Sequence, residues 1–263
     1  MKTLTFLKTH FVNDFILSEY KKMKACDNEN HKTLLFIDNH TNFLNTKLNG
    51  VQKLSFGDDL VDCFILDEIN YKETGLPYYT NDKLNKDFSS LMWYCCDYPL
   101  YIIRNQYPEY DYYWQIESDV YMNNDSYTAF YEKYENNNSD LIMALFKSIN
   151  GSDKIEDDWV YQGQLKYSGI FPVVRISNKA SDFCYKRRLE LAKIFKKISD
   201  KKTYWWTYCE YFVPTECTLN GFECEPLTEE FIRIFPNYNL EKDILTESPN
   251  NKLYHPVKLN IKR

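Results

Sequence analysis

The stretch that decides the fold is Tyr110-Asp-Tyr-Tyr-Trp-Gln-Ile-Glu117-Ser-Asp119-Val-Tyr121. Aromatic and β-branched residues dominate its first half, which favours a buried strand. Glu117 and Asp119 follow directly, one residue apart. In open α/β sheets ligands gather at the carboxyl ends of strands, and two carboxylates there can share a divalent cation. The stretch therefore predicts a central strand that ends in a Mg²⁺ or Mn²⁺ site, and the alternative is a solvated acidic turn.

Around this stretch, short apolar runs alternate with longer segments of helical character. That alternation is typical of an α/β protein with a mixed, mainly parallel central sheet flanked by helices. We find no internal repeat and no linker rich in Pro, Gly or Ser, so we expect a single domain. We expect further strands at 3–8, 32–37, 61–66, 140–146 and 222–226, a strand pair at 167–177, and helices between 83 and 106.

Composition excludes several classes of protein. The 263 residues carry a net charge of −6 and only seven glycines. No two glycines are separated by a single residue, so the phosphate-binding G-x-G-x-x-G loop is absent, as is the P-loop. A nucleoside diphosphate would need another partner for its charge. The acidic balance also argues against nucleic-acid binding.

Cysteine use and hydropathy indicate the compartment. The eight cysteines form no C-x-x-C pair, which argues against a zinc ribbon and a disulfide framework. The first residues hold no apolar run long enough for a secretory signal, and no segment reaches the roughly 18 apolar residues of a membrane span. We therefore expect a cytoplasmic protein with reduced thiols.

One basic segment, from Lys186 to Lys202, breaks the acidic balance. Eight of its residues are Lys or Arg. Apolar residues recur within it at helical spacing, which predicts a basic amphipathic helix. Such a helix is typical of core packing with a solvated basic face. The alternative is peripheral contact with anionic lipid on the inner face of the membrane.

The acidic pair and its strand resemble those of the GT-A glycosyltransferases, and more narrowly a bacterial, uncharacterised GT-A-like group whose central strand reads YWQIE-x-DV. The resemblance covers roughly residues 3–258 by the order of elements. It implies a GT-A-like, Rossmann-like fold in which Glu117 and Asp119 hold Mn²⁺ or Mg²⁺ against the diphosphate of a nucleotide sugar. The family has Asp at the first of these positions, so Glu117 is the weaker match.

Two further segments match the family. Trp205-Trp206-Thr-Tyr-Cys-Glu210 looks like the segment that inverting members place beneath the acceptor, which makes Glu210 the general base and both indoles sugar-stacking groups. The alternative is two core aromatics and an acid that favours a helix N-terminus. In the tail, the resemblance makes His255 a metal ligand and lets Lys258 contact a phosphate oxygen.

A second acidic segment competes with Glu210. Asp157 and Asp158 lie beside Trp159 in a loop, where they can form an acceptor rim or supply the base. We assign them to acceptor binding.

The function expected from these features is metal-dependent, inverting transfer of a sugar from a nucleoside diphosphate sugar, a UDP-sugar first, to a glycan or lipid-linked acceptor in cell-surface polysaccharide biosynthesis. Residues 1–150 would bind the donor. Residues 151–263 would bind the acceptor, with the tail closing on the metal site. A nucleotidyltransferase and a non-catalytic carbohydrate- or partner-binding module are the alternatives.

Overall fold

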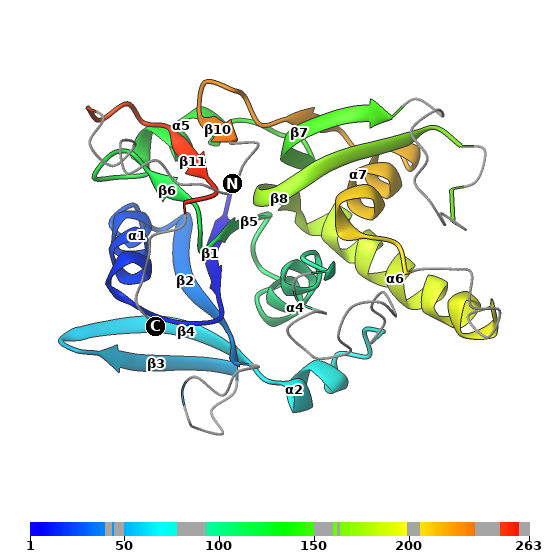
Figure 1. Cartoon of the computed structure of the whole chain (residues 1–263), viewed down its shortest axis with the longest axis horizontal. Coiled ribbons are helices and arrows are strands. Elements are labelled where there is room, and N and C mark those ends of the chain that lie inside the picture. The colour runs from blue at the N-terminus through cyan, green and yellow to red at the C-terminus, as the bar shows by residue number, and fades with distance from the viewer. Residues whose placement is uncertain are drawn as a thin grey trace.

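The structure, a computed structural model, describes residues 1–39, 44, 50–77, 92, 94–149, 160–161, 164–198, 206–234 and 248–257. Helices and strands alternate along the chain and form one α/β domain (Figure 1). In chain order the elements are β1 (Thr3–Thr9), α1 (Asp14–Lys24), β2 (His31–Asp38), β3 (Gly50–Phe56), β4 (Asp59–Leu66), α2 (Glu68–Glu73), α4 (Tyr98–Gln106), β5 (Tyr112–Glu117), β6 (Tyr121–Met122), α5 (Thr128–Tyr134), β7 (Leu141–Ile149), β8 (Lys166–Ser177), α6 (Asn178–Ile198), α7 (Cys209–Leu219), β9 (Cys224–Pro226), β10 (Ile232–Ile234) and β11 (Leu253–His255).

Eight strands form the central sheet in the order β3-β4-β2-β1-β5-β8-β7-β9. Strands β4, β2, β1 and β5 run parallel, and β9 is parallel to β7. Strand β8 is antiparallel to both of its neighbours, and β3 is antiparallel to β4. The expected α/β class with a mixed, mainly parallel sheet is confirmed. Because strands from both halves of the chain share this sheet, the domain is single.

The expected strands are all present, with two differences. Residues 167–177 lie in one strand, β8, rather than in a pair. The strand is irregular but continuous: Pro172 lies where the register between β7 and β8 shifts, a place where a sheet tolerates proline. Strand β3 was not predicted. It pairs with β4 across a turn at Gly57, whose φ of 61° suits glycine.

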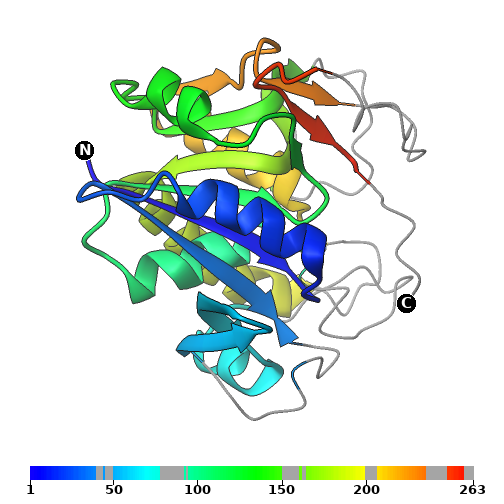
Figure 2. The ribbon, with the colours of Figure 1, turned by 90° about the vertical axis from the view of Figure 1, so that its left-hand side faces the viewer.

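Helices cover both faces of the sheet (Figures 1 and 2). Successive side chains of a strand point to opposite faces, so Phe6 and Leu7 of β1 enter different clusters. Leu7 packs with residues of α1 and α5, such as Ile16 and Phe130. Phe6 belongs to the cluster that α4, α6 and α7 complete. The two clusters hold the sheet rigidly between layers of helix.

A small second sheet holds the C-terminal tail. Its order is β10-β11-β6, with β11 parallel to β10 and antiparallel to β6. Leu253 and Tyr254 of β11 are buried. The tail strand lies along β10 at the side of the domain (Figure 2).

The basic helix is present as α6, but its basic residues are not all on one solvated face. Arg188 is fully buried, and its Nε donates to Asp97 Oδ2 at 2.8 Å. Its guanidinium lies 3.7 Å from the ring centroid of Phe212. Arg187 pairs with Glu216 of α7 at 3.1 Å. These two arginines bind α6 to its neighbours and are not free for a lipid surface, which corrects the expectation for them.

The remaining described lysines of this segment, at 186, 193, 196 and 197, are exposed. Leu191 and Phe195 are buried as the helical spacing predicts, whereas Ile194 is 47% exposed. Lys201 and Lys202 lie outside the described residues. Among the residues the structure describes, no helix combines the length and apolarity needed to cross a bilayer.

Candidate metal and catalytic site

The site lies where the strand order changes direction. From β1 the chain places β2 and β4 on one side and β5 on the other, so the switch point falls between β1 and β5. Ligands of open α/β sheets bind at the carboxyl ends of strands at such a point. Lys8, near the end of β1, and Glu117, the last residue of β5, are register partners there. Their side chains therefore emerge on the same face of the sheet.

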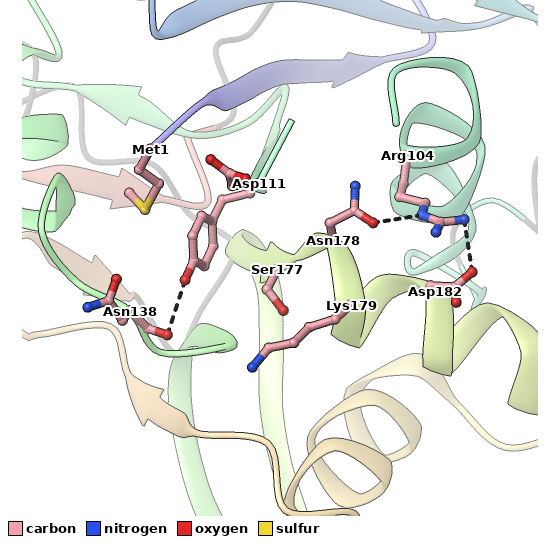
Figure 3. A pocket seen from close by; sticks show the side chains of 9 residues that line it. Met1, Arg104, Asp111, Asn138, Ser177, Asn178, Lys179 and Asp182 are labelled. Carbon is pink, nitrogen blue, oxygen red and sulfur yellow. Dashed lines mark hydrogen bonds and ion pairs between the residues drawn. The ribbon is translucent and has the colours of Figure 1, made fainter. Parts of the chain in front are cut away.

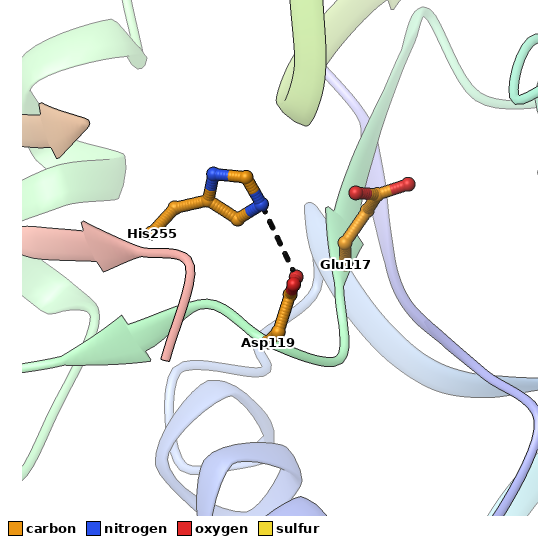
Figure 4. Close-up of side chains that lie close together, drawn as sticks. All are labelled: Glu117, Asp119 and His255. Carbon is orange, nitrogen blue, oxygen red and sulfur yellow. Dashed lines mark ion pairs between the residues drawn. The ribbon is translucent and has the colours of Figure 1, made fainter. Parts of the chain in front are cut away.

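Glu117, Asp119 and His255 come together just beyond this edge (Figure 4). One ligand atom from each lies within 4.8 Å of the others, and all three residues are half-buried. His255 Nε2 lies 3.3 Å from Asp119 Oδ1. The turn between the acids is closed by the Val120 N–H, which donates to the Glu117 carbonyl at 3.1 Å. Two carboxylates and an imidazole thus lie together at the end of the central strand.

The tail strand brings His255 to this point. Strand β11 pairs with β6, which begins two residues after Asp119. The Val257 N–H also donates to the Asp119 carbonyl at 2.7 Å. The structure therefore brings together the three residues expected to share a metal, although one comes from the far end of the chain. Lys258 lies outside the described residues.

The donor set fits a divalent cation. Carboxylate oxygens suit Mg²⁺ and Mn²⁺, whereas imidazole favours softer divalent ions such as Mn²⁺ over Mg²⁺. The Nδ1 atom of His255 is buried and has no hydrogen-bond partner among the described residues. Three protein ligands would leave coordination positions open for phosphate oxygens and water.

Lys8 was not predicted as a site residue. Its Nζ lies 3.6 Å from Glu117 Oε1 and donates to the Met92 carbonyl at 3.0 Å. Burial opposes the charge of the ammonium group, but Cys96, Glu117 and Asp38 outweigh it and raise the pKa of Lys8. Lys8 is therefore cationic beside the acidic cluster. The sequence does indicate Lys8 in one way: it is the last residue of the expected strand 3–8, and ligands of such sheets bind at the carboxyl ends of strands.

Glu210 lies in the first turn of α7. The pKa of Glu210 is raised to about 7, chiefly by burial and also by the neighbouring negative charge of Glu117. A hydrogen bond from the Phe171 backbone and the proximity of His255 oppose the shift. The residue expected to be the base therefore lies near two of the candidate metal ligands, Glu117 and His255.

The expected acceptor residues fare differently. Trp206 is 1% exposed, its Nε1 donates to Tyr98 Oη at 3.1 Å, and its ring contacts Phe195. A side chain so enclosed has no free face for a sugar, so the structure places Trp206 in the core rather than on an acceptor surface. Trp205, Asp157 and Asp158 lie outside the described residues.

A separate hollow of about 660 Å³ lies at the opposite edge of the sheet, beside the first residues of β5 and α6 (Figure 3). Its basic side chains already form ion pairs and hydrogen bonds with neighbouring residues. Arg104 binds Asp182 at 2.9 Å and Asn178 Oδ1 at 3.2 Å, while Lys179 binds Asp140 at 3.1 Å. The hollow is therefore remote from the acidic cluster and contributes no residue to it.

Three solved structures are similar to this chain in overall architecture. The galactosyltransferase LgtC, solved with donor and acceptor sugar analogues, gives a TM-score of 0.44 at 14% identity and covers 96% of this chain and 86% of its own. Mouse xyloside xylosyltransferase 1 gives 0.45 at 11% identity, covering 97% and 96%. A glycosyltransferase involved in glycosylation of the major capsid of PBCV-1 gives 0.37 at 11% identity, covering 96% and 91%.

No protein-family model matches the sequence, and a search of curated proteins finds no significant relative. The function is therefore inferred from the residues of the site.

Proposed function

We propose that this chain is a metal-dependent glycosyltransferase that moves a sugar from a nucleoside diphosphate donor to a glycan or lipid-linked acceptor. The convergence of Glu117, Asp119 and His255 at the switch point of the sheet carries the proposal. The chain has no glycine-rich phosphate loop, so the charge of a diphosphate needs another partner. A cation held by these three side chains would be that partner.

Each residue of the site has a distinct part in this chemistry. Bound to Glu117, Asp119 and His255, a divalent cation would neutralise the charge of the diphosphate leaving group. Lys8 supplies a fixed positive charge beside Glu117. Glu210, at the start of α7, accepts the proton of the attacking hydroxyl and raises its nucleophilicity. Transfer by this single displacement inverts the anomeric configuration.

We propose Mn²⁺ as the preferred cation. Mg²⁺ demands nearly ideal octahedral oxygen coordination, and an imidazole nitrogen is a poor substitute for one of those oxygens. Mn²⁺ accepts a mixed set of carboxylate and imidazole ligands more readily. His255 is the residue that makes this difference, because Glu117 and Asp119 alone would suit either ion.

The division of the chain follows from the site. We propose that residues 1–150 bind the donor and that residues 151–263 bind the acceptor and contribute His255 to the metal. Synthesis of cell-surface polysaccharide on the cytoplasmic side of the membrane is the setting that fits such an acceptor. The exposed side of α6, with Ile194 among four exposed lysines, supports peripheral contact with anionic lipid.

Ligand-induced stabilisation tests the proposed function. UDP-, GDP- and CMP-sugars are each added to the protein with and without Mn²⁺, and the melting temperature is recorded. A ligand that binds only the folded state stabilises it by RT ln(1 + [L]/Kd), so a true donor raises the melting temperature, and raises it further with Mn²⁺. Transfer to a saccharide acceptor is then followed by mass spectrometry.

Variants locate the effect. Asp119→Asn should abolish the Mn²⁺-dependent part of the stabilisation. Asp125→Asn should leave it unchanged, because Asp125 is an exposed acid that lies beyond β6. A flat response to all nucleotide sugars contradicts the proposed activity. A response that survives Asp119→Asn places the site elsewhere.

A further inference from the structure

Two charged side chains of α1 bind the short strand that follows the acidic pair. Glu19 is 1% exposed and accepts hydrogen bonds from Lys22 Nζ at 2.6 Å, from the Met122 N–H at 3.0 Å and from Tyr127 Oη at 2.9 Å. Lys22 Nζ also donates to the Met122 carbonyl at 2.9 Å. Both backbone groups of Met122 are therefore bonded to the side chains of one ion pair.

The other edge of the same strand carries the tail. Tyr121 of β6 faces Tyr254 of β11, and the Asn123 N–H donates to the Lys252 carbonyl at 2.9 Å. The Asn250 N–H returns a bond to the Asn123 carbonyl at 3.0 Å. Strand β6 thus lies between the ion pair of α1 and the strand that bears His255. The ion pair supplies the donor and the acceptor that a neighbouring strand would otherwise supply.

Aromatic side chains add further contacts between α1, β6 and the tail. Lys22 Nζ lies 4.5 Å from the ring centroid of Tyr121. Phe15, also on α1, stacks on Tyr121 with centroids 6.3 Å apart and packs against Tyr254 and Val257 of the tail. Helix α1 therefore fixes both β6 and the tail beside it.

A contribution to stability does not by itself explain the ion pair between Glu19 and Lys22. Glu19 is buried and Lys22 is 15% exposed. Desolvating such charges is costly, and a buried ion pair can often be replaced by apolar residues of similar volume without loss of stability. Met122 lies three residues after Asp119, and its pairing partner Leu253 lies two residues before His255. A shift of β6 would therefore move His255 relative to Asp119.

We propose that Glu19 and Lys22 are positioning residues for the metal site, which act through β6 and β11 on His255. The inference rests on the proposed function for the existence of that metal. Neither side chain is assigned a contact with substrate or metal. Their role is to hold the tail strand where the imidazole meets the two carboxylates.

The test measures the affinity of Mn²⁺ for the full-length parent and for its variants, by calorimetry and electron paramagnetic resonance in the absence of nucleotide. The double variant Glu19→Gln/Lys22→Met removes the pair together, so no buried charge is left without its partner. We expect Mn²⁺ affinity to fall about 10-fold, at the low end of the 10- to 100-fold typical of residues that orient metal ligands. The Mn²⁺ spectrum should also change.

A double-mutant cycle shows whether the effect passes through His255. His255→Ala should weaken Mn²⁺ binding strongly in the parent but much less in the double variant, because residues that act as one unit are not additive. Lys24→Met is the matched control. Lys24 is a lysine of the same helix whose ion-pair partners are Asp27 and Asp62 rather than residues of β6, so Mn²⁺ affinity should not change.

The outcomes separate the two proposals. A parent protein that does not bind Mn²⁺ contradicts the proposed metal site itself. A parent that binds Mn²⁺, together with a folded double variant that binds equally well or gives additive effects with His255→Ala, overturns the positioning role alone. If the double variant does not fold, Glu19→Gln replaces it. The neutral amide no longer forms the ion pair that holds Lys22 against the Met122 carbonyl. An affinity between those of the parent and His255→Ala therefore supports the role, and parental affinity refutes it.

Discussion

Lys8 and Glu117 occupy matched positions on two parallel strands, and their charged groups lie 3.6 Å apart at the switch point of the sheet. Lys8 has 11% of its side chain exposed and Glu117 has 24%. The ammonium group therefore balances an acid that we also assign to the metal. A cation and the lysine would compete for the charge of the same carboxylate.

Lys8→Met should destabilise the metal-free protein by about 1–3 kcal/mol, between the values for exposed and for buried pairs. The loss arises because Glu117 keeps its charge in a partly desolvated place. Mn²⁺ should then raise the melting temperature of the variant more than that of the parent, since the metal takes over as counter-charge. Lys21→Met, which removes an exposed pair with Asp59, should change neither quantity. Equal Mn²⁺ shifts in Lys8→Met and parent would contradict the competition.

Shortening the tail should act on folding as well as on the metal. Truncation after Lys252 removes Leu253 and Tyr254, which are 0% and 1% exposed. Burial of such side chains is worth about 1.5–3 kcal/mol each, so we expect a melting temperature many degrees lower. His255→Ala should keep the parental melting temperature without metal and lose Mn²⁺ affinity. Urea unfolding and calorimetry check both, and a truncated protein with parental stability would show that the tail does not pack as described.

Glu210→Gln should preserve donor binding and lose most turnover. Loss of a general base typically costs about 10²- to 10⁴-fold in rate, and the amide keeps the size of the side chain. Steady-state kinetics and calorimetry with the donor measure the two quantities, with Glu223→Gln, an exposed acid, as the control. The product of the parent should have inverted anomeric configuration by nuclear magnetic resonance. A rate within about threefold of the parent, far short of the expected loss, or a retained configuration would remove Glu210 from the role of base.

His31 should make the protein less stable in mild acid. Its Nε2 lies 2.8 Å from Thr5 Oγ1 in a buried site, and burial lowers the pKa of His31 below its ordinary value of 6.5. Below pH 6.5 the unfolded chain therefore binds a proton that the folded chain does not, and the free energy of unfolding falls as the pH drops toward the folded pKa. His31→Gln should flatten this slope between pH 7 and pH 5. The check is urea unfolding at several pH values, and an unchanged slope would exclude His31 as its source.

The sequence predicts those features that depend on neighbouring residues. Apolar runs located the parallel strands, and the position of Glu117 and Asp119 after such a run indicated the edge of the sheet where they meet other groups. The sequence did not predict Lys8 as a site residue, because its contact with Glu117 requires β1 and β5 to be neighbours. The order of strands in the sheet is set by tertiary packing and not by the local sequence. Strands β6 and β11 are two and three residues long, too short for a periodic pattern.

The sequence also does not predict which polar and aromatic side chains are buried. Arg188 sits in a basic, helical sequence, and only the position of Asp97 and Phe212 around it explains why it faces the core. The same packing encloses Trp206. A sequence pattern gives the periodicity of a helix but does not show which charged residue on its boundary finds a buried partner.

The central place of β1 has a consequence for how the chain reaches its native state. One edge of β1 pairs with β2 soon after it in the sequence, but the other edge waits for β5, with Thr3 opposite Tyr112. Until those distant residues arrive, an apolar strand has an open row of backbone donors and acceptors. Closing so long a loop is slow, and intermediates of this kind associate with one another through their strands. We therefore expect refolding yield to fall with protein concentration, and fragments that end before β5 to aggregate.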